Sequence, residues 1–212
     1  MTEYESDFDQ MLFYLPLSGS TFKKVYYDDL LERAVSKFVP ADDLIVPYTA
    51  TSLDDAEAVI HVVKMSENEL RKQMVSGFYS DIELTKPTDT ITNELEEKER
   101  EVEGLTKSQR VDAMYTILEC HVNLDLEGFE DLGPDGEPTG IKLPYVVTIE
   151  EGSRRVLSIR RNFAPNDPKK NKIQYFVHFK FLPGLGFYGL GLIHMIGGLS
   201  RTATAALRQL LD

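Results

Sequence analysis

The last third of the chain places a glycine-rich stretch between an aromatic strand and an apolar helix. The strand is predicted over 173–182, the glycines follow over 183–198, and the helix covers the alanine-rich segment 199–211. Glycine lets a backbone turn sharply, or lets another chain approach closely. We therefore interpret this region as a joint that docks on other polypeptide and not as a reaction centre.

Composition limits the class of protein. With 212 residues, of which 42% are apolar, the chain can bury a core as one large domain or two small ones. Its net charge of -12 argues against a free-standing nucleic-acid binder, whose affinity comes mainly from Lys and Arg. An acidic wall would still suit a passage through which a polyanion slides without sticking.

The sequence favours an intracellular product without a membrane span. The first residues are acidic, where a secretory signal would be basic and then apolar. The single cysteine, Cys120, cannot form an intramolecular disulfide and fits a reducing compartment. The apolar segment 181–199 is interrupted by glycines, a proline and a histidine, so no transmembrane helix is predicted.

Hydrophobic periodicity predicts an α+β fold with flanking helices. A first helix is expected over Glu3–Leu15, with Pro16 ending it. The capping box Ser66–Glu69 predicts a second helix, over 67–77, that ends at Gly77. Strands are predicted at 21–27, 38–48, 58–64, 114–124, 145–149, 155–160 and 173–182.

The order of the strands favours antiparallel pairing. The tight turn 150–153 joins two of them into the clearest hairpin. Three or four sequential strands after residue 113 suggest an antiparallel meander instead of βαβ units. Prolines punctuate 38–48, so that segment is expected at a sheet edge or in a small barrel-like sheet.

An acidic stretch divides the sequence. Between Asp89 and Glu103, seven acidic residues accompany only Lys98 and Arg100, which is typical of a solvated helix or a mobile excursion. In a generic cytoplasmic binding module, the same stretch would be an interaction arm. The predicted parts are a helix with a β-rich subdomain over 1–88, an acidic excursion over 89–108, and an antiparallel region ending in the apolar helix over 109–212.

One motif has the spacing of a dinucleotide-binding loop. Gly184-Leu-Gly-Phe-Tyr-Gly189 follows a strand and precedes a helix. Bulky Phe187 and Tyr188 fill the loop, however, and no strand follows the helix to complete a βαβ unit. We predict no cofactor. The alternative is a small soluble enzyme or nucleotide-binding protein that uses 184–198.

No cluster in the sequence has the spacing of a catalytic or metal site. Cys120 and His121 point to opposite faces of one strand, so they cannot bind one ion or act as a nucleophile pair. The histidines are scattered and are interpreted as structural: His61, His121, His178 and His194. Three acidic pairs are interpreted as caps of backbone amides: Asp28-Asp29, Asp42-Asp43 and Asp54-Asp55. We expect no catalytic residue and no metal.

The predicted hairpin and the loop after it, over 154–172, form the first candidate for subunit contact. Its basic residues could meet phosphate or an acidic neighbouring subunit. Charge that guards a solvated sheet edge against aggregation is the alternative. The candidate contact residues are Arg154, Arg155, Arg160 and Arg161.

The terminal helix is the second candidate. Ala205, Leu207 and Leu210 lie on an apolar flank broad enough to pack on two neighbours, and its small alanines allow close helix approach. Burial in the chain's own core is the alternative.

Several long phrases of the sequence together resemble one protein family. The phrases, in chain order, are Met11–Asp28, Phe38–Tyr48, Lys64–Arg71 and Gly189–Leu211. They resemble the portal proteins, or head-to-tail connectors, of tailed bacteriophages, in particular those of short-tailed phages and related prophages. The similarity runs over nearly the whole chain, and none of the phrases is a catalytic signature.

The resemblance implies a structural role without enzymatic activity or cofactor. Portal proteins of this family form a dodecameric ring at one capsid vertex, where terminase docks during packaging and tail or head-completion proteins attach afterwards. DNA passes through the channel without sequence-specific binding, and terminase hydrolyses the ATP. The implied locations are the host cytoplasm during assembly and then the portal vertex of the virion, without membrane contact.

The resemblance also assigns this sequence to one part of a portal. Family members are much longer than 212 residues, and the chain is similar to the region called the wing, ending in the helix that follows it. The stem helices, clip and crown have no counterpart here. The implied role of the region is to form and brace the ring.

Overall fold

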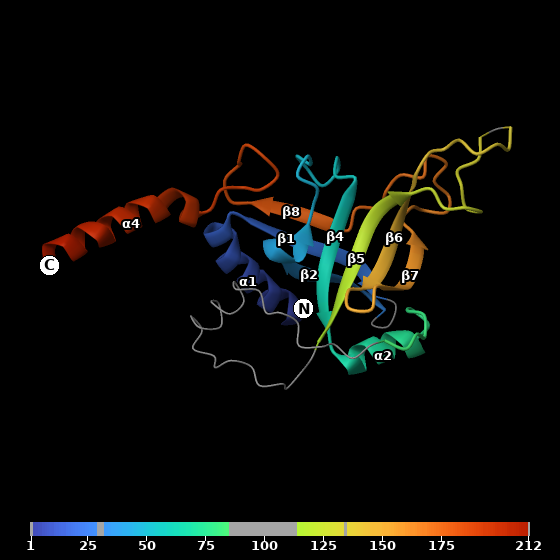
Figure 1. Ribbon diagram of the computed structural model, residues 1–212, viewed down its shortest axis with the longest axis horizontal. Helices are drawn as coiled ribbons and strands as arrows, with labels where there is room; N and C mark the ends of the chain where they lie inside the picture. The colour runs from blue at the N-terminus through green and yellow to red at the C-terminus, as the bar shows by residue number, and fades with distance from the viewer. Residues whose placement is uncertain (1, 29–31, 85–113, 134, 212) are drawn as a thin grey trace. The chain divides into compact units, whose positions relative to one another are not determined.

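The computed structural model describes residues 2–28, 32–84, 114–133 and 135–211 (Figure 1). The chain divides into two units, of which the first combines 1–59 with 163–212 and the second covers 60–162. The described residues form open antiparallel sheets with helices, and no closed barrel, so the predicted α+β class is confirmed. The predicted acidic excursion, 89–108, lies outside the described residues.

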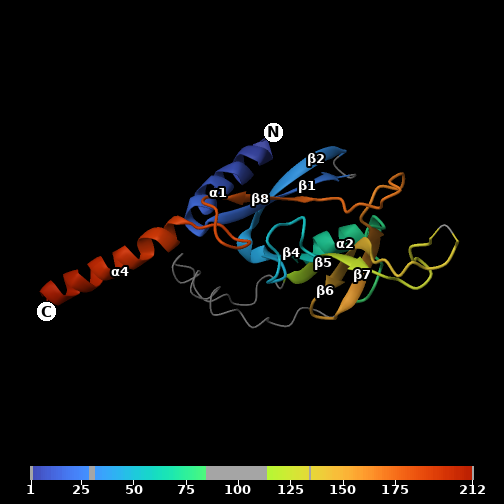
Figure 2. The same cartoon turned by 90° about the horizontal axis from the view of Figure 1, so that it is seen from above.

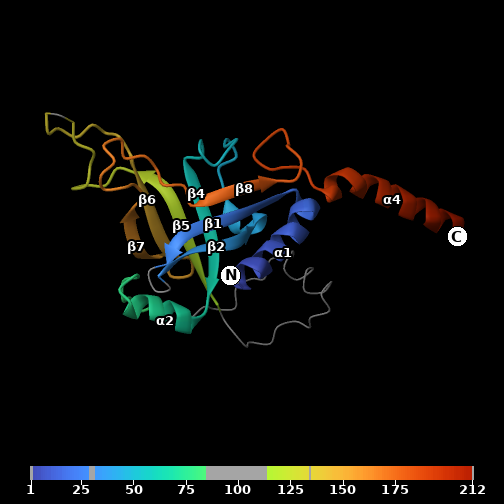
Figure 3. The same ribbon diagram turned by 180° about the vertical axis from the view of Figure 1, so that it is seen from behind.

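The first unit is built on a three-stranded sheet of order β2-β1-β8, comprising β1 (Ser20–Asp28), β2 (Arg33–Pro40) and β8 (Phe176–Lys180). β2 pairs with β1 from Pro40 opposite Thr21 to Arg33 opposite Asp28. β8 comes from the last third of the chain and lies along the other side of β1 (Figure 3). The regular strand is shorter than the predicted 173–182.

The helix α1 (Thr2–Ser18) covers this sheet through contacts with β1 and β2 (Figure 2). The prediction that Pro16 ends the helix is wrong. A proline in the last turn removes only the hydrogen bond to the Leu12 carbonyl, so the helix continues to Ser18. Gly19 ends it instead, with a φ of 87° and a hydrogen bond of 2.9 Å from its N–H to the Leu15 oxygen.

Segment 38–48, expected as one strand at a sheet edge, is not a continuous strand. Residues 38–40 end β2, whose residues 33–37 the sequence did not reveal, and a 3-10 turn η1 (Ala41–Asp43) and the two-residue strand β3 (Leu44–Ile45) follow. Among the described strands, β2 and β3 each end their sheet, as the prolines in 38–48 predict.

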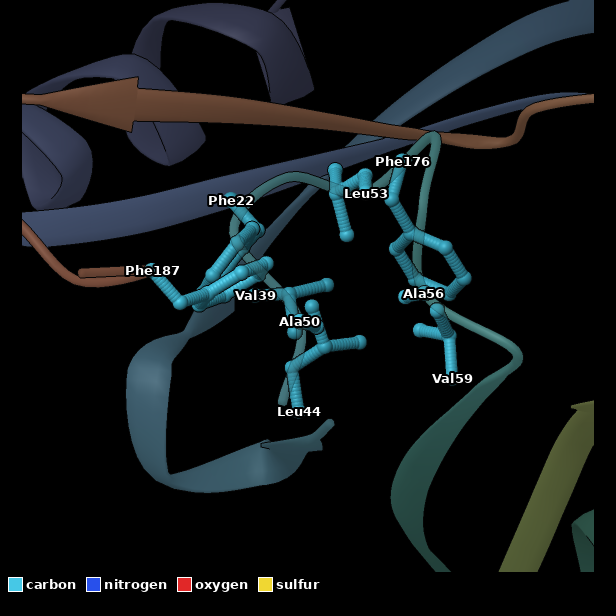
Figure 4. Close-up of a cluster of buried hydrophobic side chains, with 9 residues drawn as sticks. All are labelled: Phe22, Val39, Leu44, Ala50, Leu53, Ala56, Val59, Phe176 and Phe187. Carbon is cyan, nitrogen blue, oxygen red and sulfur yellow. The ribbon is translucent and has the colours of Figure 1, made fainter. Parts of the chain in front are cut away.

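A cluster of buried side chains forms the core of the first unit (Figure 4). Phe22 of β1 is fully buried, and Phe187 from the glycine-rich stretch is 6% exposed. Their rings stack with centroids 5.9 Å apart. The cluster therefore ties the end of the chain to its beginning. Its members are Phe22, Val39, Leu44, Ala50, Leu53, Ala56, Val59, Phe176 and Phe187.

The second unit contains a meander. The strands follow the order β4-β5-β6-β7 and comprise β4 (Ala58–Met65), β5 (Tyr115–Leu124), β6 (Leu143–Glu150) and β7 (Arg155–Arg161). β3 precedes β4 in the full sheet order, and the first residues of β4 belong to the first unit. The antiparallel pairing of β5, β6 and β7 confirms the predicted meander and hairpin.

Hydrogen bonds from nearby side chains fix the start of the helix and the turn between β6 and β7 in this unit. The helix α2 (Glu67–Val75) begins with the predicted capping box, in which Ser66 accepts from the Glu69 amide. Gly77, with a φ of 77°, closes it. At the β6–β7 turn the buried Glu150 carboxylate accepts from the amides of Gly152 and Ser153 at 2.9 and 2.6 Å. The core of the second unit is a cluster of buried side chains, namely Leu70, Met74, Tyr79, Tyr115, Ile117 and Leu157.

The terminal helix α4 (Leu192–Leu211) is longer than predicted. It begins within the glycine-rich stretch and passes through Gly197 and Gly198, each of which costs a helix up to about 1 kcal/mol relative to Ala. The apolar residues at helical spacing on both sides of the pair are exposed, so burial within this chain does not offset that cost. Among the described helices, none is long and apolar enough to cross a membrane.

Candidate functional site: protein-contact surfaces

The glycine-rich joint folds back onto the turn between α1 and β1. The Ser20 hydroxyl, which is buried, accepts a hydrogen bond of 2.7 Å from the Gly189 amide. A Cβ at Gly191 would lie 2.6 Å from the Gly19 nitrogen, and one at Gly189 would lie 2.7 Å from the Leu182 oxygen. The glycines are thus required for close backbone approach. The segment that approaches belongs to the same chain, and not to another chain as the sequence suggested.

The nucleotide-loop alternative finds no support in this geometry. Phe187 occupies the centre of the loop and stacks on both Phe22 and His178, with centroids 5.9 and 4.8 Å away. Tyr188 directs its hydroxyl to the Leu44 carbonyl at 3.5 Å. The Gly189 amide, which would have to face a phosphate, already binds the Ser20 oxygen. Side chains therefore fill the space that a pyrophosphate would need.

His178 lies in the same cluster as a structural residue. Its ring is 4.4 Å from the Phe22 ring, and its Nε2 is 3.1 Å from the Ser20 Oγ. Burial, with a smaller contribution from the positive charge of Lys180, lowers the pKa of His178 to about 4. The ring is consequently neutral at pH 7, when the Ser20 hydroxyl can donate to its nitrogen.

His121, His194 and Cys120 also have the contacts of structural groups. His121 Nε2 lies 2.9 Å from Glu119 Oε1, and His194 Nδ1 accepts from the Gly191 amide at 3.1 Å. Burial, and secondarily the Glu119 charge, raises the pKa of the Cys120 thiol, which makes it a poor nucleophile. The described residues contain no group of three side chains able to hold a metal ion.

Of the three acidic pairs, Asp54-Asp55 shows the predicted capping of backbone amides. Asp55 accepts from the amides of Thr51 and Ser52 at 3.1 and 2.8 Å, as the capping interpretation predicts. The hydrogen bond from the Thr51 hydroxyl is the main cause that lowers the pKa of Asp55 to about 2. Asp42 and Asp43 lie in η1. Asp28 ends β1, and residue 29 lies outside the described part of the chain.

All four predicted hairpin arginines are exposed, and the structure brings them to one strand and its turn. Arg154 occupies the turn with a φ of 54°, and the others lie on β7. The Arg160 guanidinium carbon is 3.7 Å from the centre of the Phe78 ring, and that of Arg161 is 5.8 Å from the Phe129 ring. Within the described residues, neither these two nor Arg154 and Arg155 form an ion pair.

The helix α4 presents its apolar side chains to solvent. Leu199, Leu207 and Leu210 are 72%, 62% and 83% exposed, and Ala205 is exposed as well. Burial in the chain's own core, the alternative from the sequence, is therefore wrong for this helix. Among the described elements, its main contacts are with α1.

Sequence reasoning missed part of this surface. Ile193 and Ile196, each more than half exposed, extend the apolar side of α4 into the glycine-rich stretch. Continuing the 3.6-residue period backwards from Leu199 would have found them. The glycine pair at 197–198 hid the signal, because it suggested a loop.

Comparison with known proteins adds the family. A family model described as phage SU10 portal protein matches residues 23–212. No curated protein matches the chain. The family match covers far more than half of the sequence and confirms the resemblance carried by its long phrases. The chain therefore belongs to the phage SU10 portal protein family and is a structural component of a phage portal.

Proposed function

We propose that this chain forms the wing region of a portal and braces a closed ring of identical copies at one capsid vertex. The ring surrounds the channel through which the genome is packaged and later ejected. Its partners are terminase during packaging and tail or head-completion proteins afterwards. Assembly takes place in the host cytoplasm, and the finished ring belongs to the virion.

The exposed apolar side of α4 carries the proposal. Leu199, Leu207 and Leu210 leave a continuous apolar flank in water, which costs roughly 25 cal/mol per Å² until another surface covers it. Contiguous apolar patches of this kind mark protein contact sites. Packing of α4 on a neighbouring subunit around Leu207 and Leu210 removes this surface from solvent. Ala205, two residues before Leu207, lies on the other side of the helix.

Charge and side-chain chemistry agree with a passive channel component. The net charge of -12 disfavours tight DNA binding, which a passage must avoid. We propose that the chain has no catalytic activity and that DNA passes it without base-specific contact. The hairpin residues Arg154, Arg155, Arg160 and Arg161 then serve subunit pairing.

Native mass spectrometry of the protein expressed from its complete gene tests the proposal. We expect a closed ring whose mass is a whole multiple of the subunit mass, and particles that package DNA when terminase and ATP are added. Nucleotides alone should leave the melting temperature unchanged. A protein that stays monomeric at every soluble concentration, or that is stabilised by a nucleotide bound at 184–198, would contradict the proposal.

A further inference from the structure

The outer edge of β7 in the second unit is basic and partly apolar. Among the described strands, β7 is the last of its sheet. Segment 78–80 covers part of its outer edge, because the Ser80 amide donates to the Leu157 oxygen at 2.8 Å. Val156 and Ile159 are still 42% and 51% exposed. The side chains of this strand, rather than its backbone, are therefore available for contact with another chain.

The arginines on this edge are positioned to receive carboxylates. Stacking on Phe78 orients the guanidinium of Arg160, because the ring lies 3.7 Å from the guanidinium carbon. A stacked guanidinium keeps its in-plane N–H donors available for bidentate bonds to a carboxylate. Arg161, over Phe129, and Arg155 add charge along the same strand and form no ion pair within the described part of the chain.

The loop between β5 and β6, residues 125–142, is described at 125–133 and 135–142, and these residues have the complementary chemistry (Figure 1, yellow). Its acidic residues are Asp125, Glu127, Glu130, Asp131, Asp135 and Glu137, against the single basic Lys142. Two large apolar side chains in the loop, Leu132 and Ile141, are 59% and 58% exposed, whereas Phe129 already lies against Arg161 of the same copy. Acidic and apolar groups together match the arginines and exposed aliphatic residues of the β7 edge.

The loop is held in shape before it meets a partner. Leu132 and Pro138 form an isolated bridge, and the Gly133 amide donates to the Glu137 oxygen at 2.9 Å. The Thr139 hydroxyl donates to the Asp131 carboxylate at 2.8 Å. A loop ordered in this way loses little conformational entropy on binding.

We propose that the acidic loop 125–142 of one copy docks on the basic β7 edge of the next copy. The inference rests on the proposed ring and names one of its contacts. Two different patches of the same chain that bind head to tail generate a ring when the rotation closes. Because the chain is acidic overall, most approaches between copies are repulsive, and the β7 edge is a place where an acidic neighbour is attracted.

Two charge reversals of equal size test the contact in the protein expressed from its complete gene. R160E/R161E makes the edge acidic, and E127K/E137K makes the loop basic. The control, K37E/K72E, reverses two exposed lysines that lie on β2 and α2. Circular dichroism and melting curves check that each variant is folded. Sedimentation velocity and native mass spectrometry measure the fraction in rings.

Each reversal alone should lower the ring fraction by at least about tenfold, whereas the control should not change it. An equimolar mixture of the two variants should assemble again, since each reversed loop then meets a reversed edge and each native loop meets a native edge. Such rings contain the two variants in strict alternation, which native mass spectrometry reports as equal numbers. Raising the salt concentration should weaken assembly.

If R160E/R161E and E127K/E137K, each tested alone, both form rings in unchanged yield, the contact is overturned while the proposed function stays intact. Failure of two folded variants to assemble as a mixture would also overturn it. If R160E/R161E instead loses only binding to a DNA duplex, the edge takes phosphate and not protein, and the inference is wrong. An unmodified protein that never forms rings would overturn the proposed function and the contact together.

Discussion

Two neighbouring segments place large apolar side chains in opposite environments. Glycine supplies four of the eight residues of the joint 184–191 and two of the twenty in α4, and both segments carry large apolar residues. Phe187 of the joint is 6% exposed, whereas Leu210 of α4 is 83% exposed. The joint finds a complementary surface at the Gly19–Ser20 turn, and within the described residues no segment covers α4 to a comparable extent. Apolar content alone therefore does not decide burial; an adjoining surface that fits is needed as well.

The largest expected effect, and the clearest test of the buried joint, is at Phe187. Phe187→Ala removes a buried ring that stacks on Phe22 and His178, so the free energy of unfolding should fall by about 3–5 kcal/mol. Phe13→Ala is the matched control, because Phe13 of α1 is 69% exposed and should change the value by less than about 0.5 kcal/mol. Urea unfolding measures both. Equal losses at the two positions would mean that the joint is not part of the core.

Glycine substitutions sharpen the same contrast. Gly191→Ala places a Cβ against the Gly19 nitrogen and the backbone of Ser18, so about 1–3 kcal/mol of stability should be lost. Gly198→Ala in α4 meets nothing within 4 Å and should gain up to about 1 kcal/mol from helix propensity. Thermal unfolding gives both signs. A neutral result at Gly191 would contradict the close backbone approach.

Protonation of His178 probes the joint more gently. Its folded pKa of about 4 lies below the ordinary value of 6.5, so the unfolded state binds the proton more readily. Stability from this residue is complete above about pH 6.5 and is lost as the pH falls towards 4. His178→Gln should remove that part of the pH dependence. Unfolding free energies between pH 7 and 4 with the same slope in both proteins would refute this role.

Features that depend on neighbours in sequence could be predicted. The Ser66 capping box, the β6–β7 hairpin and the exposed arginines all follow from residues a few positions apart. The family resemblance was likewise visible in long phrases of the chain.

Features that depend on contacts between distant segments could not be predicted from the sequence. Nothing near Phe176 in the sequence indicates that β8 pairs with β1, and nothing near Gly191 indicates the Gly19 turn. Pro16 and the pair Gly197-Gly198 misled local rules, because each sits where a helix tolerates one lost bond or a modest entropic cost. The exposure of α4 is also non-local, since it reflects which surfaces the rest of the chain leaves over.

The smallest expected change in stability, and the sharpest functional one, is at Leu210. Leu210→Ser should shift the free energy of unfolding by no more than about 0.5 kcal/mol, because the side chain is 83% exposed. Val75→Ser is its control on α2, where Val75 is also 83% exposed. If α4 is a contact surface, only Leu210→Ser reduces ring formation in sedimentation velocity. If the two variants change ring formation equally, the exposed side of α4 is not a contact surface. The joint and the helix would then differ only in how much their side chains contribute to stability.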